Sequence, residues 1–171
     1  MTAEYKTIRN SLKKKLPHSR MVYPERTTHR LKYHFWRIYT PAHPYVRDLA
    51  LALRLVKHDH RVDFLIGTVA GHSSTEELVS HLVSKGFGYH KVAWEDDGEI
   101  VGLRHVENFL HQYHIRIYED GEVRAHYEFT PEAYPLLHLN AVGLEERREE
   151  FLALLTDHII PHTPDDLVQE K

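Results

Sequence analysis

The sequence contains no cysteine among its 171 residues. This absence excludes disulfide bonds, thiolate metal ligands and a cysteine nucleophile. Any metal ion would have to be held by histidine and carboxylate side chains. The N-terminus carries charge but is not followed by an apolar run, so we expect no signal peptide and a cytoplasmic location.

Signals for membranes and for nucleotide cofactors are also missing. No apolar run approaches the roughly 18 residues that a membrane-spanning helix needs, so we expect no membrane partner. The glycine patterns of Walker and Rossmann sites do not occur, and we expect no cofactor. A hydrophobic content of 42% and a charged content of 27% are ordinary for a globular protein. The length suits one domain with a substantial core.

The formal net charge of −3 hides an asymmetry along the chain. Residues 1–37 contain ten of the 22 Lys and Arg residues and two acidic residues, a net charge of +8. The remaining residues contain 12 basic and 23 acidic side chains, a net charge of −11. Apolar spacing predicts a helix over residues 3–16, with Lys6, Arg9 and Lys13 along another face. This basic helix either contacts a polyanion or folds back on the acidic body.

The order of the hydrophobic patterns predicts an α+β fold. We expect one mixed or antiparallel sheet of about six strands, which ends in a β-meander and has helices packed on one face. After the helix at 3–16, helices are predicted over 44–60, 74–86 and 144–160, and strands over 31–39 and 62–69. Residues 1–30 form a basic helix and arm, 31–162 the α+β domain, and 163–171 a frayed tail.

The clearest structural signal is a β-hairpin over residues 111–129. Apolar and polar residues alternate on both sides of an Asp-Gly turn. A three-residue loop pairs Ile117 with Val123 and keeps one face apolar, whereas a two-residue loop mixes apolar and charged side chains. We favour the first register, because a slip by one residue turns every side chain to the wrong face. It places His114 directly opposite His126.

A second Asp-Gly turn occurs about 24 residues before the first. It predicts a neighbouring hairpin in which Trp94 pairs with Val101 and His90 lies opposite His105. Together the two hairpins supply four successive strands.

The polar face of the hairpin at 111–129 holds the main candidate site residues. His114 and His126 are candidates for a general acid–base pair, because histidine titrates near neutral pH. Arg116 and Arg124 are candidates for anion binding, because guanidinium groups donate charge-assisted hydrogen bonds to phosphate and carboxylate. With helices on the opposite face, we expect this polar face to be open.

The same face offers weak candidates for a metal site. Cross-strand His114 and His126 lie close enough to share one ion, and Glu128 could complete the coordination. Arg116 and Arg124 would repel a cation, and no established zinc spacing occurs. We therefore do not favour a metal ion from the sequence.

A second anion-binding candidate lies in a small turn before the predicted helix at 74–86. His72, Ser73 and Ser74 would lie at a helix N-terminus, where backbone N–H groups bind phosphate or carboxylate. Ser74 and Glu77 also match a capping box, which explains these residues without a ligand.

Three function classes follow from these features. The first is a binding module that holds an anionic partner, nucleic acid or a phosphorylated ligand, through the basic arm and the His/Arg face. The second is a protein–protein interaction domain or homodimer that uses the same face. The third is a small phosphoester hydrolase with histidine acid–base catalysis. No nucleophile can be identified, so the sequence does not decide whether the protein is an enzyme.

Overall fold

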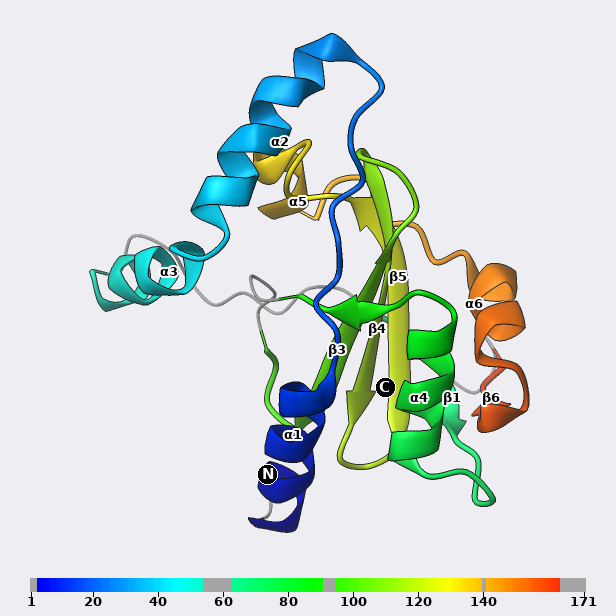
Figure 1. Cartoon of the computed structure of the whole chain (residues 1–171). Coiled ribbons are helices and arrows are strands. Elements are labelled where there is room, and N and C mark those ends of the chain that lie inside the picture. The colour runs from blue at the N-terminus through cyan, green and yellow to red at the C-terminus, as the bar shows by residue number, and fades with distance from the viewer. Residues whose placement is uncertain (1–2, 54–62, 91–94, 140, 164–171) are drawn as a thin grey trace.

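The computed structural model describes residues 3–53, 63–90, 95–139 and 141–163. Six strands form one sheet, and helices lie around it (Figure 1). The helices are α1 (Ala3–Lys15), α2 (Thr27–Tyr39), α3 (His43–Ala52), α4 (Thr75–Ser84), α5 (Pro135–Leu139), α6 (Arg148–Leu155) and the 3₁₀ helix η1 (Thr156–His158). The strands are β1 (Phe64–Val69), β2 (Gly88–Tyr89), β3 (Glu99–Val106), β4 (His111–Tyr118), β5 (Glu122–Phe129) and β6 (Ile159–Pro161).

The strand order in the sheet is β2-β3-β4-β5-β1-β6, and every neighbouring pair is antiparallel. Strands β2 to β5 follow one another as a meander. Strand β1 then joins β5, and β6 joins β1, so the complete sheet is not a strict meander. The predicted α+β class and the sheet of about six strands are confirmed.

The β4–β5 hairpin has the predicted register. Ile117 pairs with Val123, and His114 pairs with His126. Gly121 in the loop has φ of 87°, a left-handed conformation that glycine adopts without steric cost. The alternation of side chains along both strands therefore separates an apolar face from a polar face, as expected.

The apolar face carries the hydrophobic core. Ile115, Ile117 and Val123 are fully buried there. Helices α4 and α6 lie over this face (Figure 1), and α1 also contributes to the core. The helical residues fully or almost fully buried in it are Leu12, Leu78, Val79, Leu82, Phe151 and Leu155. Among the residues described, no helix is long and apolar enough to cross a membrane.

The strand predicted over residues 31–39 is wrong, because these residues belong to helix α2. Their aromatic content favoured a strand. However, His29, Tyr33 and Trp36 recur at helical spacing and form the inner side of the helix. The rings of His29 and Tyr33 lie 5.4 and 6.5 Å from the ring of Phe109. Tertiary packing therefore selects a helix here.

The helix predicted over residues 144–160 is too long at both ends. Helix α6 covers Arg148–Leu155, and β6 follows after η1. Arg147 and Thr156 have φ of 42° and 52°, which are incompatible with a right-handed helix. The chain before α6 instead pairs with β5, since the backbones of Tyr127 and Glu145 exchange hydrogen bonds of 2.8 and 2.7 Å.

The predicted register of the second hairpin is also wrong. Tyr89 pairs with Leu103, so His90 does not lie opposite His105. Strand β2 has only two residues and connects to β3 through a long segment, so the Asp-Gly turn does not set its register. Residues 91–94 of this predicted hairpin lie outside the described residues, as do the end of the predicted helix at 44–60 and residues 164–171.

The polar face of the sheet is buried, which corrects the expectation of an open face. His114, His126 and Glu128 are 5%, 0% and 1% exposed. Three neighbouring segments bring carboxylates to this face. Asp63 comes from the segment before β1, Asp96 from the segment before β3, and Glu132 from the segment after β5. A homodimer contact through an open polar face therefore has no structural basis.

Candidate functional site

His126 lies in the middle of β5 and is fully buried. Its Nδ1 forms an ion pair with Oδ1 of Asp63, and its Nε2 lies 3.2 Å from Oε1 of Glu128. Burial lowers the pKa of His126, but the charge of Glu128 and the contact with Asp63 outweigh burial and raise the pKa to about 9. Without another cation, this ring is protonated at neutral pH.

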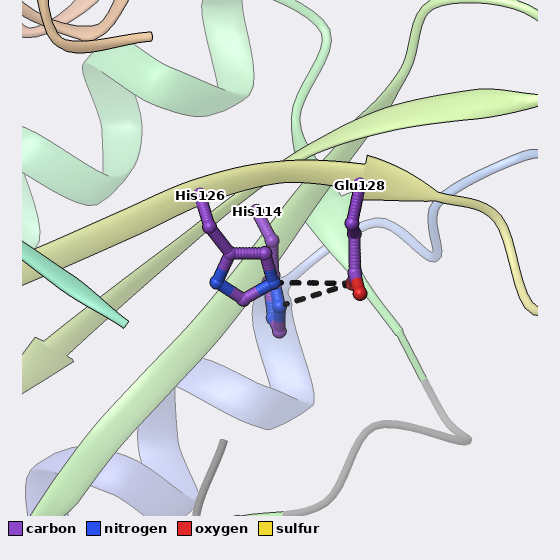
Figure 2. Close-up of side chains that lie close together, drawn as sticks. All are labelled: His114, His126 and Glu128. Carbon is purple, nitrogen blue, oxygen red and sulfur yellow. Dashed lines mark ion pairs between the residues drawn. The ribbon is translucent and has the colours of Figure 1, made fainter. Parts of the chain in front are cut away.

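Glu128 gathers three histidines around one carboxylate. Oε1 lies 3.2 Å from Nε2 of His126 and 3.9 Å from Nδ1 of His114 (Figure 2). Oε2 lies 3.0 Å from Nδ1 of His138, and Gln112 donates a 2.9 Å hydrogen bond to Oε1. Burial raises the pKa of Glu128, but the charges of His126 and His138 hold it well below its ordinary value.

Three of these side chains converge as metal ligands do. The ligand atoms of His114, His126 and Glu128 all lie within 4.8 Å of one another. The two imidazole rings stand at 86° with their centroids 5.0 Å apart, so their nitrogens approach the carboxylate from different directions (Figure 2). Three nitrogen and oxygen ligands leave one position open in a tetrahedral site. Asp63 contacts the second ring nitrogen of His126, as carboxylates do behind metal-bound histidines.

Arg116 does not act as a free positive charge beside this group. Its Nη1 lies 3.0 Å from Oδ2 of Asp63 and also pairs with Asp96, and its Nε lies 3.8 Å from Oε2 of Glu99. Burial lowers the pKa of Arg116, but the three carboxylates outweigh burial and raise it above its ordinary value. The sequence-based objection that Arg116 repels a cation is therefore weakened.

A second buried guanidinium group, that of Arg104, lies on the polar face next to His114. Arg104 donates hydrogen bonds of 3.1 and 2.8 Å to the two carboxylate oxygens of Glu132, and one of 2.9 Å to Gln112. Gln112 connects this pair to Glu128. Burial and the charge of Arg104 hold the pKa of the neighbouring His90 well below its ordinary value, so His90 is neutral.

Among the described residues, the buried polar face carries more carboxylates than guanidinium groups. Five carboxylates oppose two guanidinium groups on it: Asp63, Asp96, Glu99, Glu128 and Glu132 against Arg104 and Arg116. Burial raises the pKa of Glu99, so this group holds its proton more readily than an exposed glutamate. Protonated histidines or one divalent cation can balance the excess of negative charge.

The basic face of α1 contacts the acidic body. Arg9 and Lys13 both form ion pairs with Glu95, and the ammonium group of Lys13 lies 5.4 Å from the ring centroid of Tyr89. Lys6 is exposed on the same helix. Of the two alternatives left by the sequence, these contacts favour an arm that folds back on the body.

The turn before α4 has internal partners for its serines. Ser74 accepts a hydrogen bond from the backbone of Glu77, and the Glu77 carboxylate accepts one from the backbone of Ser74, which confirms the predicted capping box. The Ser73 hydroxyl lies 2.8 Å from Nδ1 of His158. His72 is exposed. The structure does not bring this turn together with the buried histidines.

Arg124 also lies apart from the histidines, although it shares their sheet. Its Nε donates a 2.8 Å hydrogen bond to Glu122, and its guanidinium lies 4.8 Å from the ring centroid of Tyr118. The candidate site therefore contains His114, His126, Glu128 and Arg116, whereas Arg124 belongs to the edge of the polar face.

Sequence reasoning missed several partners in the site. Asp63 and Glu132 come from segments without a local motif, and His138 lies on the short helix α5. Each of these residues contacts a residue of the polar face that lies between 10 and 63 positions away in the sequence. The only signal in the sequence was the polar alternation of β4 and β5, which predicts a polar face but does not name what covers it.

An open cavity of about 750 Å³ lies beside the site, between α2 and residues 131–138. His138 and Glu132 line the cavity. His138 contacts Glu128, and Glu132 contacts Arg104, so the cavity borders the buried polar face. Its volume falls within the range of small-molecule sites.

Comparisons of the chain with protein-family models, with curated proteins and with solved structures find no match.

Proposed function

We propose that the protein is a binding module for an anionic ligand, and that a divalent transition-metal ion held by His114, His126 and Glu128 mediates the binding. Imidazole nitrogens and a carboxylate oxygen suit Zn²⁺ and its first-row neighbours. The position that these three residues leave open would accept a phosphate or carboxylate oxygen of the ligand. The anionic partner expected from the sequence is thus assigned to the polar sheet face rather than to the basic arm.

The observation that carries this proposal is the convergence of three buried ligand atoms within 4.8 Å. Two further observations support it. Asp63 lies behind His126 and can fix the orientation of its ring, which metal-binding histidines commonly require. The negative excess of the polar face supplies the charge that a dication would balance.

Metal binding is tested by titrating Zn²⁺ into chelator-treated protein in a calorimeter. We expect one ion per chain, and a visible absorption spectrum typical of four- or five-coordinate cobalt when Co²⁺ replaces Zn²⁺. His114→Gln and Glu128→Gln should each weaken binding by about 100-fold or more, because each removes one of three protein ligands. His72→Gln removes an exposed histidine elsewhere and serves as the matched control.

The proposal fails if Zn²⁺ does not bind, or if His114→Gln and Glu128→Gln bind it as the unchanged protein does. Circular dichroism of each variant checks that the fold is retained. Binding of inorganic phosphate to the zinc-loaded protein, and its loss in Glu128→Gln, tests the anionic ligand.

The hydrolase is the second candidate, and the open coordination position favours it. Metal sites with three protein ligands commonly bind a water molecule in the fourth position, and the metal lowers the pKa of that water. Hydrolysis of bis(p-nitrophenyl) phosphate by the zinc-loaded protein, abolished in His114→Gln, would establish this activity. Phosphate binding without hydrolysis would exclude the hydrolase and support the binding module.

A further inference from the structure

We infer that the cavity between α2 and residues 131–138 binds a small amphipathic carboxylate, with its apolar body against α2 and its carboxylate at Lys32. This inference goes beyond the proposed metal site, because it assigns a separate subsite to the chain. It rests on the lining of the cavity and on the charges there.

The wall of the cavity formed by α2 is apolar and aromatic. Leu31, Phe35, Trp36 and Tyr39 line it. The rings of Phe35 and Tyr39 are stacked at 5.3 Å, and Trp36 meets Tyr39 edge-on at 5.2 Å. These contacts form a continuous aromatic surface. Leu31 and Phe35 are 81% and 57% exposed, so the wall presents apolar area that a ligand could remove from water.

Lys32 supplies the positive charge of the cavity. Its ammonium group donates a 2.7 Å hydrogen bond to the carbonyl oxygen of Ala133 and lies 5.0 Å from the ring centroid of Tyr134. Within the described part of the chain, no carboxylate pairs with it. These contacts fix the ammonium group at the cavity edge while leaving donors for a ligand, because an ammonium group has three N–H bonds.

The acidic residue of the lining does not oppose an anion strongly. Both carboxylate oxygens of Glu132 are held by Arg104, at 2.8 and 3.1 Å. His138, also in the lining, is directed to Glu128 and to the backbone carbonyl of Phe129. Among the described lining residues, Lys32 carries a permanent positive charge, which favours an anionic ligand, and His43 also lines the cavity.

The size of the cavity limits the ligand. About 750 Å³ of open space suits a molecule with one or two rings or a medium-length chain. Such a ligand has few atoms, so we expect a dissociation constant on the order of 0.1 mM for a bicyclic carboxylate.

The test uses 2-naphthoate and its uncharged analogue 2-naphthol, titrated calorimetrically into the full chain with excess chelator present. We expect 2-naphthoate to bind about tenfold more tightly than 2-naphthol, because only the carboxylate forms an ion pair with the ammonium group of Lys32. Lys32→Gln should remove this preference and leave 2-naphthol binding unchanged. Phe35→Ala should weaken both ligands. Lys14→Gln removes an exposed lysine of α1 and should change neither.

The inference is overturned if neither compound binds, if acid and alcohol bind equally, or if Lys32→Gln keeps the preference. Lys32 and Phe35 are exposed, so we expect these variants to retain the fold. Because chelator is present, binding of 2-naphthoate is measured independently of the metal site. Zinc binding without naphthoate binding therefore refutes the cavity ligand alone, and the reverse result refutes the metal site alone.

Discussion

Nε2 of His126 lies 3.2 Å from Oε1 of Glu128, two residues away on the same strand and the same face of the sheet. The other nitrogen of this ring pairs with Asp63, so one imidazole lies between two carboxylates. Such an arrangement holds a positive charge between the two carboxylates. The charge is either a proton on the ring or a metal ion that replaces it at Nε2, and the two states respond differently to substitution and to pH.

Asp63→Asn tests whether Asp63 orients His126 as a metal ligand. The amide keeps the size of the carboxylate but removes its negative charge. A carboxylate that contacts the second nitrogen of a metal-bound histidine orients the ring and strengthens metal binding. We expect Zn²⁺ affinity to fall by about 10- to 100-fold. Calorimetry with a competing chelator measures it.

Asp97→Asn is the matched control, since Asp97 is exposed in the loop before β3. It should leave Zn²⁺ affinity unchanged. Equal affinities for Asp63→Asn and the unchanged protein would show that Asp63 serves the fold alone.

In metal-free protein, stability should depend on the proton of His126. The folded pKa of about 9 exceeds the ordinary 6.5, so the protonated ring stabilises the folded state. Neighbouring Asp63 and Glu128 have lowered pKa values and stay ionised throughout this range. The stabilisation is complete below pH 6.5 and is lost as the pH rises through about 9. A rise in the pKa of His126 from 6.5 to about 9 corresponds to about 3 kcal/mol of stabilisation.

Urea unfolding in the presence of chelator, from pH 6 to 10, measures this loss. His126→Gln should unfold at lower urea concentration, and its free energy of unfolding should lack the decrease between pH 6.5 and 9. An identical pH dependence in both proteins would show that His126 is neutral in the folded state. Added Zn²⁺ should flatten the curve of the unchanged protein, because the metal replaces the proton.

The sequence was most informative where structure is local. The alternation along residues 111–129 has only one register that separates apolar from polar side chains, and the pairing of His114 with His126 follows from it. The capping box at Ser74 was equally readable, because its partner is three residues away. Both features depend on neighbours in the chain.

The sequence was least informative where distant segments decide the outcome. The aromatic residues of α2 suit a strand by propensity, but packing of His29 and Tyr33 against Phe109 selects a helix. Burial of the polar face depends on Asp63, Glu132 and similar residues from other segments. Polar alternation therefore indicated an open surface, and only the tertiary structure reveals a buried ionic network.

Arg116 and Arg124 pair across β4 and β5, yet they should differ strongly in their contributions to stability. Arg116 is 2% exposed and pairs with Asp63 and Asp96, whereas the side chain of Arg124 is 41% exposed. Arg116→Met leaves buried carboxylates without their partner, and we expect a loss of about 3–5 kcal/mol in the free energy of unfolding. Arg124→Met removes one exposed pair with Glu122 and should cost at most about 1 kcal/mol.

Urea unfolding of both variants at pH 7 measures the difference between these two cross-strand neighbours. The result also bears on the metal site. If Arg116 neutralises carboxylates that a metal ion would otherwise attract, added Zn²⁺ should restore more stability to Arg116→Met than to Arg124→Met. Equal losses in the two variants would mean that the carboxylates around Arg116 take up protons without cost, and the negative excess of the polar face would then not favour a dication.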